Sequence, residues 1–321
     1  MRAARITELG RLPEIGEAPN PVRGEGEALI SVTAVPLNPI DINVGAGRFY
    51  GGHPPLPFVP GGEAVGRVVE GEMLARDTLV WANGAGVGVK RDGSLAELVA
   101  VPEEVVVPLP TDVDPVLAGA LGVAGIAGWL PVAYREPVRE GDTVLVLGAT
   151  GTVGLVAMQA ARLLGAGRVV AAGRRPEALE RARRLGADEV VSLEAEDLAA
   201  AFKEACGGDG PTLVIDPLWG EPAVAAATAA ARGARLVHIG QSAGAAAPFL
   251  SADVRGKELT ILGYSNLSTP REVINREYLR LLEHARSGEI EVEIQTFPFE
   301  RLAEAWQAQA EGAGAKVVVT L

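Results

Sequence analysis

Three glycines lie at a regular spacing in the middle of the chain. Gly148, Gly151 and Gly154 follow a short apolar run and lead into a helical pattern at 152–164. A turn without side chains lets a pyrophosphate approach the backbone amides and the N-terminus of the helix. Ala149 replaces the first glycine of the usual G-x-G-x-x-G pattern, and the turn also fits the pattern G-x-x-G-x-x-G. The turn predicts a dinucleotide site, and its residues are Gly148, Ala149, Thr150, Gly151, Thr152 and Val153. The alternative is a tightly packed strand–helix turn without a ligand.

Two arginines follow the next apolar run, which ends at Gly173. An NAD site usually carries an Asp or Glu about 20 residues after the glycine turn, bonded to the ribose hydroxyl. Here Arg174 and Arg175 occupy that place, and no acidic residue lies between Val169 and Arg175. Guanidinium groups bind a phosphate through paired hydrogen bonds and gain little from a bare ribose. We therefore predict NADP(H) rather than NAD(H), with Gly173, Arg174 and Arg175 in the site. In the alternative, the arginines belong to the solvated first turn of the helix beginning at Pro176.

The residues of this site must be positioned by alternating strands and helices. Strand-like runs at 189–193, 212–216, 235–239 and 259–263 are separated by helical patterns at 176–186, 196–205 and 221–232. Such alternation predicts a doubly wound parallel sheet, a Rossmann fold with helices on both faces. Cofactors bind where the carboxyl ends of parallel strands meet. The loop after residue 239 therefore adds Gly240, Gln241 and Ser242 to the predicted cofactor residues.

Residues 1 to about 115 follow a different pattern. Short alternating or apolar runs at 28–35, 64–69, 78–81 and 95–101 are separated by Gly and Pro. Many short strands with frequent turn signals predict a mainly β, barrel-like domain.

Composition limits the classes of partner. The 321 residues suffice for two domains, and 48% hydrophobic with 22% charged residues indicates a folded chain. A net charge of −12 argues against nucleic acid as the main ligand. No apolar stretch has the length of a membrane span or a signal-peptide core, so we expect no membrane partner and a cytoplasmic location. The single cysteine, Cys206, excludes an internal disulfide and a cysteine-based zinc cluster.

Several motifs, in this order, resemble the zinc-independent medium-chain dehydrogenase/reductases of the quinone oxidoreductase group. They are LNPID at 37–41, PGGEAVG at 60–66, GATGTVG at 148–154, LGAD at 185–188, IDPLWG at 215–220 and IGQ at 239–241. The resemblance implies a GroES-like catalytic domain at 1–115 and 265–321 and a Rossmann domain at 116–264. It also implies NADPH, a small-molecule quinone or enone substrate, and a homodimer joined through the sheet edges.

Departures from the family pattern affect the predicted chemistry. Zinc-dependent relatives have a cysteine at the position of Asn38 and a histidine at that of Gly62, and a zinc site needs about three thiolate, imidazole or carboxylate ligands. We therefore expect no catalytic metal. The family's lysine for the 2′-phosphate is Glu177 here, and its tyrosine partner is Leu193. The NADP(H) prediction thus depends on the two arginines.

Three residues are the predicted catalytic candidates: Asn38, Asp41 and Tyr50. Asn38 could donate an amide N–H to a developing oxyanion, or be a structural residue bonded to backbone. Asp41 could instead be a helix N-cap or turn residue, and Tyr50 a packing or lid residue. Family placement puts Tyr264, Ser265 and Asn266 beside the nicotinamide. His238 is expected to be a core residue, Cys206 to be inert, and Glu63 to be a buried structural partner.

The leading hypothesis is an NADPH-dependent, metal-independent reductase of quinones or α,β-unsaturated carbonyls. The cofactor would supply the hydride and the protein would position and polarise the acceptor. An enoyl reductase acting on a thioester or biosynthetic intermediate is the second hypothesis. A third, from another class, is an NADPH-binding, redox-responsive protein with little turnover.

Overall fold

Two sheets organise the chain, and each belongs to a different unit. The computed structural model describes residues 1–321. Unit 1 comprises 1–124 and 293–321, and unit 2 comprises 125–292. Compared with the predicted division at 115 and 264, unit 1 gains 116–124 and unit 2 gains 265–292. The long helix α9 (Arg271–Arg286) groups with unit 2, where its Glu277 accepts a hydrogen bond from buried Trp129 at 3.0 Å.

Unit 2 contains a six-stranded sheet in the order β10-β9-β8-β11-β12-β13, and every pair in it is parallel. The strands are β8 (Thr143–Val146), β9 (Arg168–Gly173), β10 (Glu189–Ser192), β11 (Leu213–Asp216), β12 (Arg235–His238) and β13 (Thr260–Gly263). Runs of Val, Leu and Ile suit the inner strands because both of their faces are covered. The predicted doubly wound parallel sheet is confirmed.

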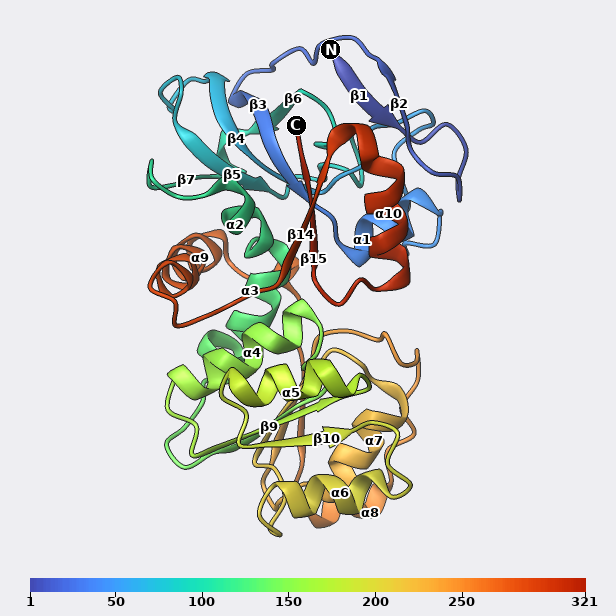
Figure 1. Cartoon of the computed structure of the whole chain (residues 1–321), viewed down its shortest axis with the longest axis vertical. Helices are drawn as coiled ribbons and strands as arrows, with labels where there is room; N and C mark the ends of the chain where they lie inside the picture. The colour runs from blue at the N-terminus through green and yellow to red at the C-terminus, as the bar shows by residue number, and fades with distance from the viewer. The chain divides into compact units, whose positions relative to one another are not determined.

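Helices cover both faces of this sheet. They are α4 (Thr152–Leu163), α5 (Pro176–Arg184), α6 (Leu198–Ala205), α7 (Gly220–Ala229) and α8 (Ser251–Gly256). In Figure 1, α4 and α5 lie on one side of β9 and β10, and α6 and α7 lie on the other. Pro176 opens α5 at a position where the missing backbone N–H has no helical partner to lose.

Unit 1 is mainly β, as predicted. Its main sheet has the order β14-β15-β3-β4-β5-β7, with β6 also paired to β3, and β1 and β2 form a separate antiparallel pair. The strands are β1 (Arg2–Arg5), β2 (Glu14–Glu17), β3 (Glu27–Pro36), β4 (Glu63–Glu70), β5 (Leu79–Asn83), β6 (Leu98–Pro102), β7 (Val106–Pro108), β14 (Ile294–Pro298) and β15 (Lys316–Thr320).

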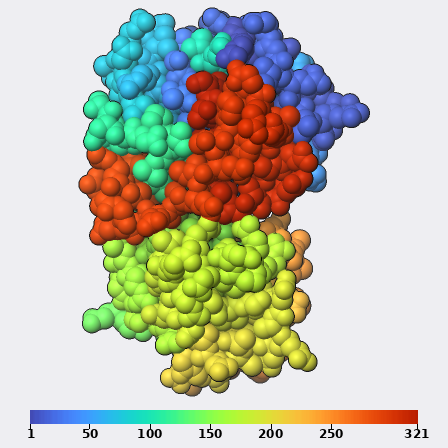
Figure 2. All heavy atoms as spheres, viewed as in Figure 1, coloured from blue at the N-terminus to red at the C-terminus, as the bar shows by residue number.

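The two ends of the chain meet within unit 1. β15 pairs antiparallel with β3, with Val319 opposite Val35. Figure 2 shows the C-terminal segment, in red, forming one face of this unit beside the blue N-terminal residues. Three helices complete the unit: α1 (Pro39–Gly45), α2 (Pro115–Ala120) and α10 (Leu302–Glu311).

Local structure departs from the predicted elements at a few places. The helix expected over 125–134 is α3 (Val123–Leu130), followed by a π-helical turn at Pro131–Arg135 that begins at a proline. The short helix α8 was not predicted, and α1 was anticipated only through the alternative that Asp41 caps a helix. None of the helices is both long enough and apolar enough to cross a membrane.

Candidate functional site

Backbone crowding explains the outer two glycines of the predicted turn. Gly148 has φ +61°, a left-handed conformation that side chains disfavour. A Cβ atom on Gly154 would lie 2.4 Å from the Gly148 carbonyl oxygen and 2.7 Å from the Ala149 Cα. Gly154 therefore lets α4 pack against the turn that follows β8.

Gly151, the middle glycine, is not crowded. A Cβ there would have only the Gly148 carbonyl oxygen within 4 Å, at 3.7 Å. Gly151 is also the N-cap of α4, and no side chain caps that helix. The first amides of a twelve-residue helix are thus left for another acceptor, and the positive end of the helix dipole favours an anion. The residues present fit the pyrophosphate of a dinucleotide.

Arg174 and Arg175 follow β9 at the same edge of the sheet, and both are exposed. Neither forms an ion pair with an acidic side chain. Gly173 packs directly against the turn, because a Cβ there would lie 2.4 Å from Thr150 Cγ2. The two guanidinium groups therefore follow a strand end that touches the glycine turn, a position suited to a phosphate ligand.

The remaining predicted cofactor loops meet at neighbouring strand ends. Asp216, His238 and Gly263 are in register at the ends of β11, β12 and β13. Gly240 lies against the Pro217 carbonyl oxygen, which a Cβ would approach to 2.7 Å. The Ser242 hydroxyl donates to the same oxygen at 3.2 Å. Gln241 lies between these two residues, so the loop after β12 is fixed to the loop after β11.

Tyr264 and Asn266 form a small polar group after β13. The Tyr264 hydroxyl donates to Asn266 Oδ1 at 2.7 Å and accepts from Thr269 Oγ1 at 3.3 Å. Burial raises the pKa of Tyr264 to about 12, so its hydroxyl is neutral at physiological pH. The Ser265 hydroxyl accepts from Leu267 N and caps the turn at Asn266–Ser268.

His238 was expected to be a core residue, but it is only partly buried. Its side chain is 30% exposed, and its Nδ1 lies 3.6 Å from Oδ2 of fully buried Asp216. Its ring is 4.0 Å from that of Trp219, measured between centroids. Burial raises the pKa of Asp216, although the backbone amides of Leu218 and Trp219 bond its other oxygen. Sequence reasoning missed this pair, since only the register of β11 and β12 brings the residues together.

Unit 1 contains the predicted residues Asn38 and Asp41 in a buried polar cluster with Glu63 and Lys316. All four are at most 3% exposed. Asn38 Nδ2 donates to Glu63 Oε1 at 2.6 Å and to the Pro36 carbonyl oxygen at 3.4 Å. Lys316 Nζ donates to Asn38 Oδ1 at 2.6 Å and to the Leu37 carbonyl oxygen at 2.8 Å. The Asn38 amide is thus bonded at both ends.

Asp41 connects the start of α1 to the residue before β4. Its Oδ2 accepts from the Asn38 backbone N–H at 2.7 Å, and its Oδ1 accepts from the Gly62 N–H at 2.9 Å. Asn38, and not Asp41, is the N-cap of the helix, and Asp41 is its third residue. The second oxygen of Glu63 accepts from Trp81 Nε1 and the Val123 N–H, each at 2.9 Å.

Burial dominates the ionisation of this cluster. It raises the pKa of Asp41 to about 6, beyond the opposing effect of the two backbone N–H groups. It also raises the pKa of Glu63 and lowers that of Lys316. Lys316 was not predicted as a site residue. A lysine that opens the run KVVV of a buried strand was the only local signal for it.

The donor set of this cluster does not fit zinc. Zn²⁺ prefers thiolate, imidazole and carboxylate ligands. The cluster offers two carboxylates, Asp41 and Glu63, which is fewer than the three protein ligands of a catalytic zinc site. Asn38 and Gly62 supply neither a thiolate nor an imidazole, and the Lys316 ammonium has no lone pair to give. No group of three or more His, Cys, Asp or Glu side chains in the structure could hold a metal ion.

Tyr50, the third predicted catalytic residue, is 90% exposed. Its ring lies 4.5 Å from that of Phe49, between centroids. Cys206 is buried, and burial raises its pKa to about 12, which keeps the thiol protonated and poorly nucleophilic.

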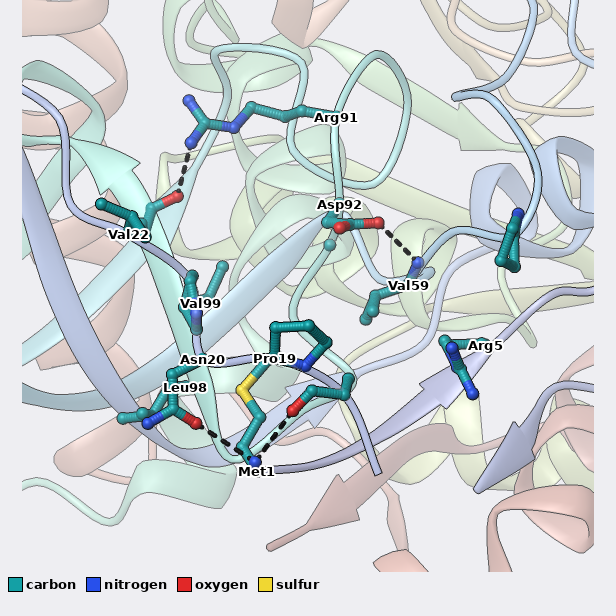
Figure 3. A pocket seen from close by; sticks show the side chains of 15 residues that line it. Met1, Arg5, Pro19, Asn20, Val22, Val59, Arg91, Asp92, Leu98 and Val99 are labelled. Atoms are coloured by element: carbon teal, nitrogen blue, oxygen red, sulfur yellow. Dashed lines mark hydrogen bonds between the residues drawn. The ribbon is translucent and has the colours of Figure 1, made fainter. Parts of the chain in front are cut away.

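A cavity of about 430 Å³ lies elsewhere in unit 1. Figure 3 shows its wall, which includes Pro19, Asn20, Arg91, Leu98 and Val99. Arg91 is already paired with Glu27 at 2.6 Å, and Asp92 Oδ1 accepts from the Val59 N–H at 2.8 Å. None of the predicted site residues lines this cavity.

Two family models match the chain. Residues 24–111 match the alcohol dehydrogenase GroES-like domain, and residues 152–284 match the zinc-binding dehydrogenase model. The first match confirms the predicted GroES-like character of unit 1.

Full-length relatives and a partial one are also found. Human quinone oxidoreductase is 26% identical over 98% of this chain and 95% of its own length. The chloroplastic NADPH-dependent alkenal/one oxidoreductase of Arabidopsis thaliana is 35% identical over 54% of this chain and 47% of its own length. The quinone oxidoreductase of Thermus thermophilus has been solved, including its complex with NADPH. It is 31% identical to this chain with a TM-score of 0.81, and each chain is covered completely.

Proposed function

The chain belongs to the quinone oxidoreductase group of the medium-chain dehydrogenase/reductase family, and on this basis we propose that it transfers hydride from NADPH to a quinone or an α,β-unsaturated carbonyl. The predicted family is confirmed, and the chain is an oxidoreductase. One observation carries the finer proposal. The glycine turn at the N-terminus of α4 lies beside two arginines without acidic partners, in a fold shared with an NADPH-binding relative.

Residues of unit 2 would hold the cofactor. The amides of Thr152 and Val153 would bind the pyrophosphate, and Arg174 with Arg175 would bind the 2′-phosphate. Gly151, whose own N–H donates to the Gly148 carbonyl oxygen at 3.1 Å, would leave room for the phosphate beside the helix N-terminus. The bound dihydronicotinamide supplies the hydride, and the protein supplies position and electrostatics. Gly148, Ala149, Thr150 and Gly173 would shape the turn.

The loops after β12 and β13 would complete the cofactor site. Gly240, Gln241 and Ser242 would line the cofactor between its pyrophosphate and its nicotinamide. Tyr264, Ser265 and Asn266 would line the nicotinamide end, with the Tyr264 hydroxyl kept neutral and available for hydrogen bonding.

The roles of Asn38, Asp41 and Tyr50 are also proposals. The Asn38 side-chain amide already donates to Glu63 and accepts from Lys316. This supports a role in positioning the substrate side of the site more than a direct hydrogen bond to an oxyanion. Asp41 would hold the Asn38 backbone, and Tyr50, exposed on the loop after α1, would contact the acceptor or cover it.

The first experiment measures oxidation of NADPH and NADH, by the loss of reduced-cofactor absorbance, against a panel of quinones, enals and enones. We expect turnover with NADPH preferred. The variant Arg174→Ala/Arg175→Ala should weaken NADPH binding by about tenfold to a hundredfold, since a charge-assisted hydrogen bond contributes about 1.5–3 kcal/mol. Its affinity for NADH should stay the same.

Arg183→Ala is the matched control. Arg183 lies at the far end of α5 and pairs with Glu189 at 3.4 Å, so its removal should leave the cofactor preference unchanged. Tighter binding of NADH than of NADPH by the wild type would contradict the proposed cofactor. Saturable NADPH binding with no turnover across the panel would favour the redox-responsive binding protein instead.

We also propose a homodimer that forms through β13. This strand is at the edge of the parallel sheet, paired only with β12, and Ile261 on it is 37% exposed. Two such edges could pair and continue the sheet. Ile261→Asp should then give a monomer in sedimentation experiments, and an unchanged sedimentation coefficient would contradict this interface.

A further inference from the structure

Lys316 places a positive charge inside unit 1 without a direct carboxylate partner. Lys316 is 3% exposed, and its ammonium donates to two neutral oxygens, Asn38 Oδ1 at 2.6 Å and the Leu37 carbonyl oxygen at 2.8 Å. Burying a charge is costly unless hydrogen bonds and opposite charges compensate. The opposite charges here are the carboxylates of Glu63 and Asp41, which are attracted to the ammonium without bonding to it.

The ammonium decides which way the Asn38 amide faces. Lys316 can only donate, so Asn38 must turn its oxygen toward it. Glu63 accepts hydrogen bonds from Trp81 and Val123 through its second oxygen, and its first oxygen accepts from Asn38 Nδ2. A reversed amide would place donor against donor at Lys316 and acceptor against acceptor at Glu63. Lys316 and Glu63 together therefore allow one orientation of Asn38.

This orientation is connected to the start of α1. The Leu37 carbonyl oxygen is held by Lys316, and the Asn38 backbone N–H is held by Asp41. After α1, the Arg48 N–H donates to the Asn43 carbonyl oxygen at 2.8 Å, and the exposed Tyr50 follows two residues later in the same loop. The helix thus joins the buried cluster to the loop that carries Tyr50, the third predicted catalytic candidate.

We propose that Lys316 is a positioning residue for the reaction: its ammonium, hydrogen-bonded to Asn38 Oδ1, fixes this amide and the start of α1 at the position where zinc-dependent relatives place a metal-binding cysteine. The proposal rests on the proposed reductase function for its link to turnover. It explains the poor fit of this site to zinc, because a cation supplied by the chain itself takes part in the cluster in place of a metal ion.

The test compares Lys316→Met with the double variant Lys316→Met/Glu63→Gln in the full chain. Lys316→Met should lower kcat/KM for the quinone or enone by about tenfold to a hundredfold, the range expected when a supporting group is misplaced by about 1 Å. Its Kd for NADPH should remain within about twofold of the wild type. The double variant removes both charges, and its new side-chain amide at position 63 can donate to a reversed Asn38.

The double variant separates positioning from charge balance. We expect it to recover the thermal stability lost by Lys316→Met while kcat/KM stays low, because Asn38 is reversed. Recovery of both stability and kcat/KM would overturn the proposal and reduce Lys316 to a counter-ion. A Lys316→Met protein with wild-type kcat/KM would overturn it as well.

A second measurement does not depend on turnover. The side-chain amide resonances of Asn38, in protein labelled with ¹⁵N-asparagine and assigned with Asn38→Asp, should shift in both variants. Unshifted resonances would overturn the positioning of Asn38 even if activity falls. If the wild type reduces no acceptor, the proposed function fails, while shifted resonances would still support the positioning of Asn38 by Lys316.

Discussion

Each unit buries a cluster of charged side chains, and the two clusters are built differently. In unit 2, Arg235 Nη2 contacts both oxygens of Asp142, at 2.5 and 2.6 Å, and its Nη1 contacts Glu136 at 3.0 Å. In unit 1, the ammonium of Lys316 contacts no carboxylate directly. One cluster pairs opposite charges face to face, whereas the other places a neutral amide between them.

The cluster of unit 2 lies where strands of the parallel sheet begin, and its ionisation differs from that of the cluster in unit 1. Asp142 precedes β8, Thr212 precedes β11, and Arg235 begins β12, so this cluster joins strand starts, at the edge of the sheet opposite the predicted cofactor loops. Burial alone would raise the pKa of Asp142, but hydrogen bonds from Arg139, Arg235 and Thr212 outweigh it and lower the pKa. The cluster of unit 1 has two raised carboxyl pKa values beside a single cation.

The difference indicates which buried charges serve stability and which serve function. An ion pair in which both Asp142 oxygens are bonded, by Arg235 and by the Arg139 N–H and Thr212 hydroxyl, fixes three strands and needs no further partner. A cluster with two acids, one ammonium and a bridging amide is less favourable as a stabilising device. The arrangement is better explained by the positioning of residues for the proposed reaction, and perturbed ionisation of this kind is frequent at functional sites.

The largest expected effect is the loss of stability on breaking the paired cluster. Arg235→Met should lower the free energy of unfolding by about 3–5 kcal/mol, because Asp142 is left buried without its cation. Chemical denaturation would measure the loss, and kcat of the folded fraction should stay unchanged. Arg232→Met is the matched control, since Arg232 is largely exposed in its pair with Glu258 and should contribute less than about 1 kcal/mol.

A smaller effect comes from removing one neutral donor from each cluster. Thr212 Oγ1 donates to Asp142 at 2.7 Å, and Trp81 Nε1 donates to Glu63 at 2.9 Å. Thr212→Val and Trp81→Phe should each lower the free energy of unfolding by about 2 kcal/mol, the typical size for a hydrogen bond to a charged group. Only Trp81→Phe should also lower kcat/KM, by about tenfold. Equal kcat/KM values in the two variants would remove the functional distinction between the clusters.

The sequence predicted the strand, glycine turn and helix of the proposed cofactor site well, because local rules determine these elements. The crowding at Gly154 and the exposed pair Arg174 and Arg175 follow from residues within one βαβ unit. The bond between Lys316 and Asn38 joins residues that are 278 positions apart. No local pattern shows that these two meet, so the sequence alone leaves both a direct and a structural role open for Asn38. The same holds for Asp216 and His238, which only the strand order brings together.

The smallest expected effect is a dependence of stability on pH that differs between the clusters. The pKa of Asp41 is raised from 3.8 to about 6 in the folded chain, so protonation of Asp41 favours the folded state. Its contribution is fully present below about pH 4 and is lost as the pH rises through 6. Between about pH 8 and 5, Asp41 should therefore add about 1 kcal/mol to the free energy of unfolding.

Asp142 provides the opposite case for the same measurement. Its pKa is lowered below 3.8, so its contribution is present above that value and is lost only as the pH falls further. Asp41→Asn should abolish the gain in stability between pH 8 and 5, whereas Asp142→Asn should lower stability by the same amount at both pH values. If Asp41→Asn retained the full gain, the proton would bind elsewhere, and Glu63, whose pKa is also raised, would be the next residue to test. Loss of the gain in Asp41→Asn alone would show that the cluster of unit 1 takes up a proton in a range where the paired cluster of unit 2 does not.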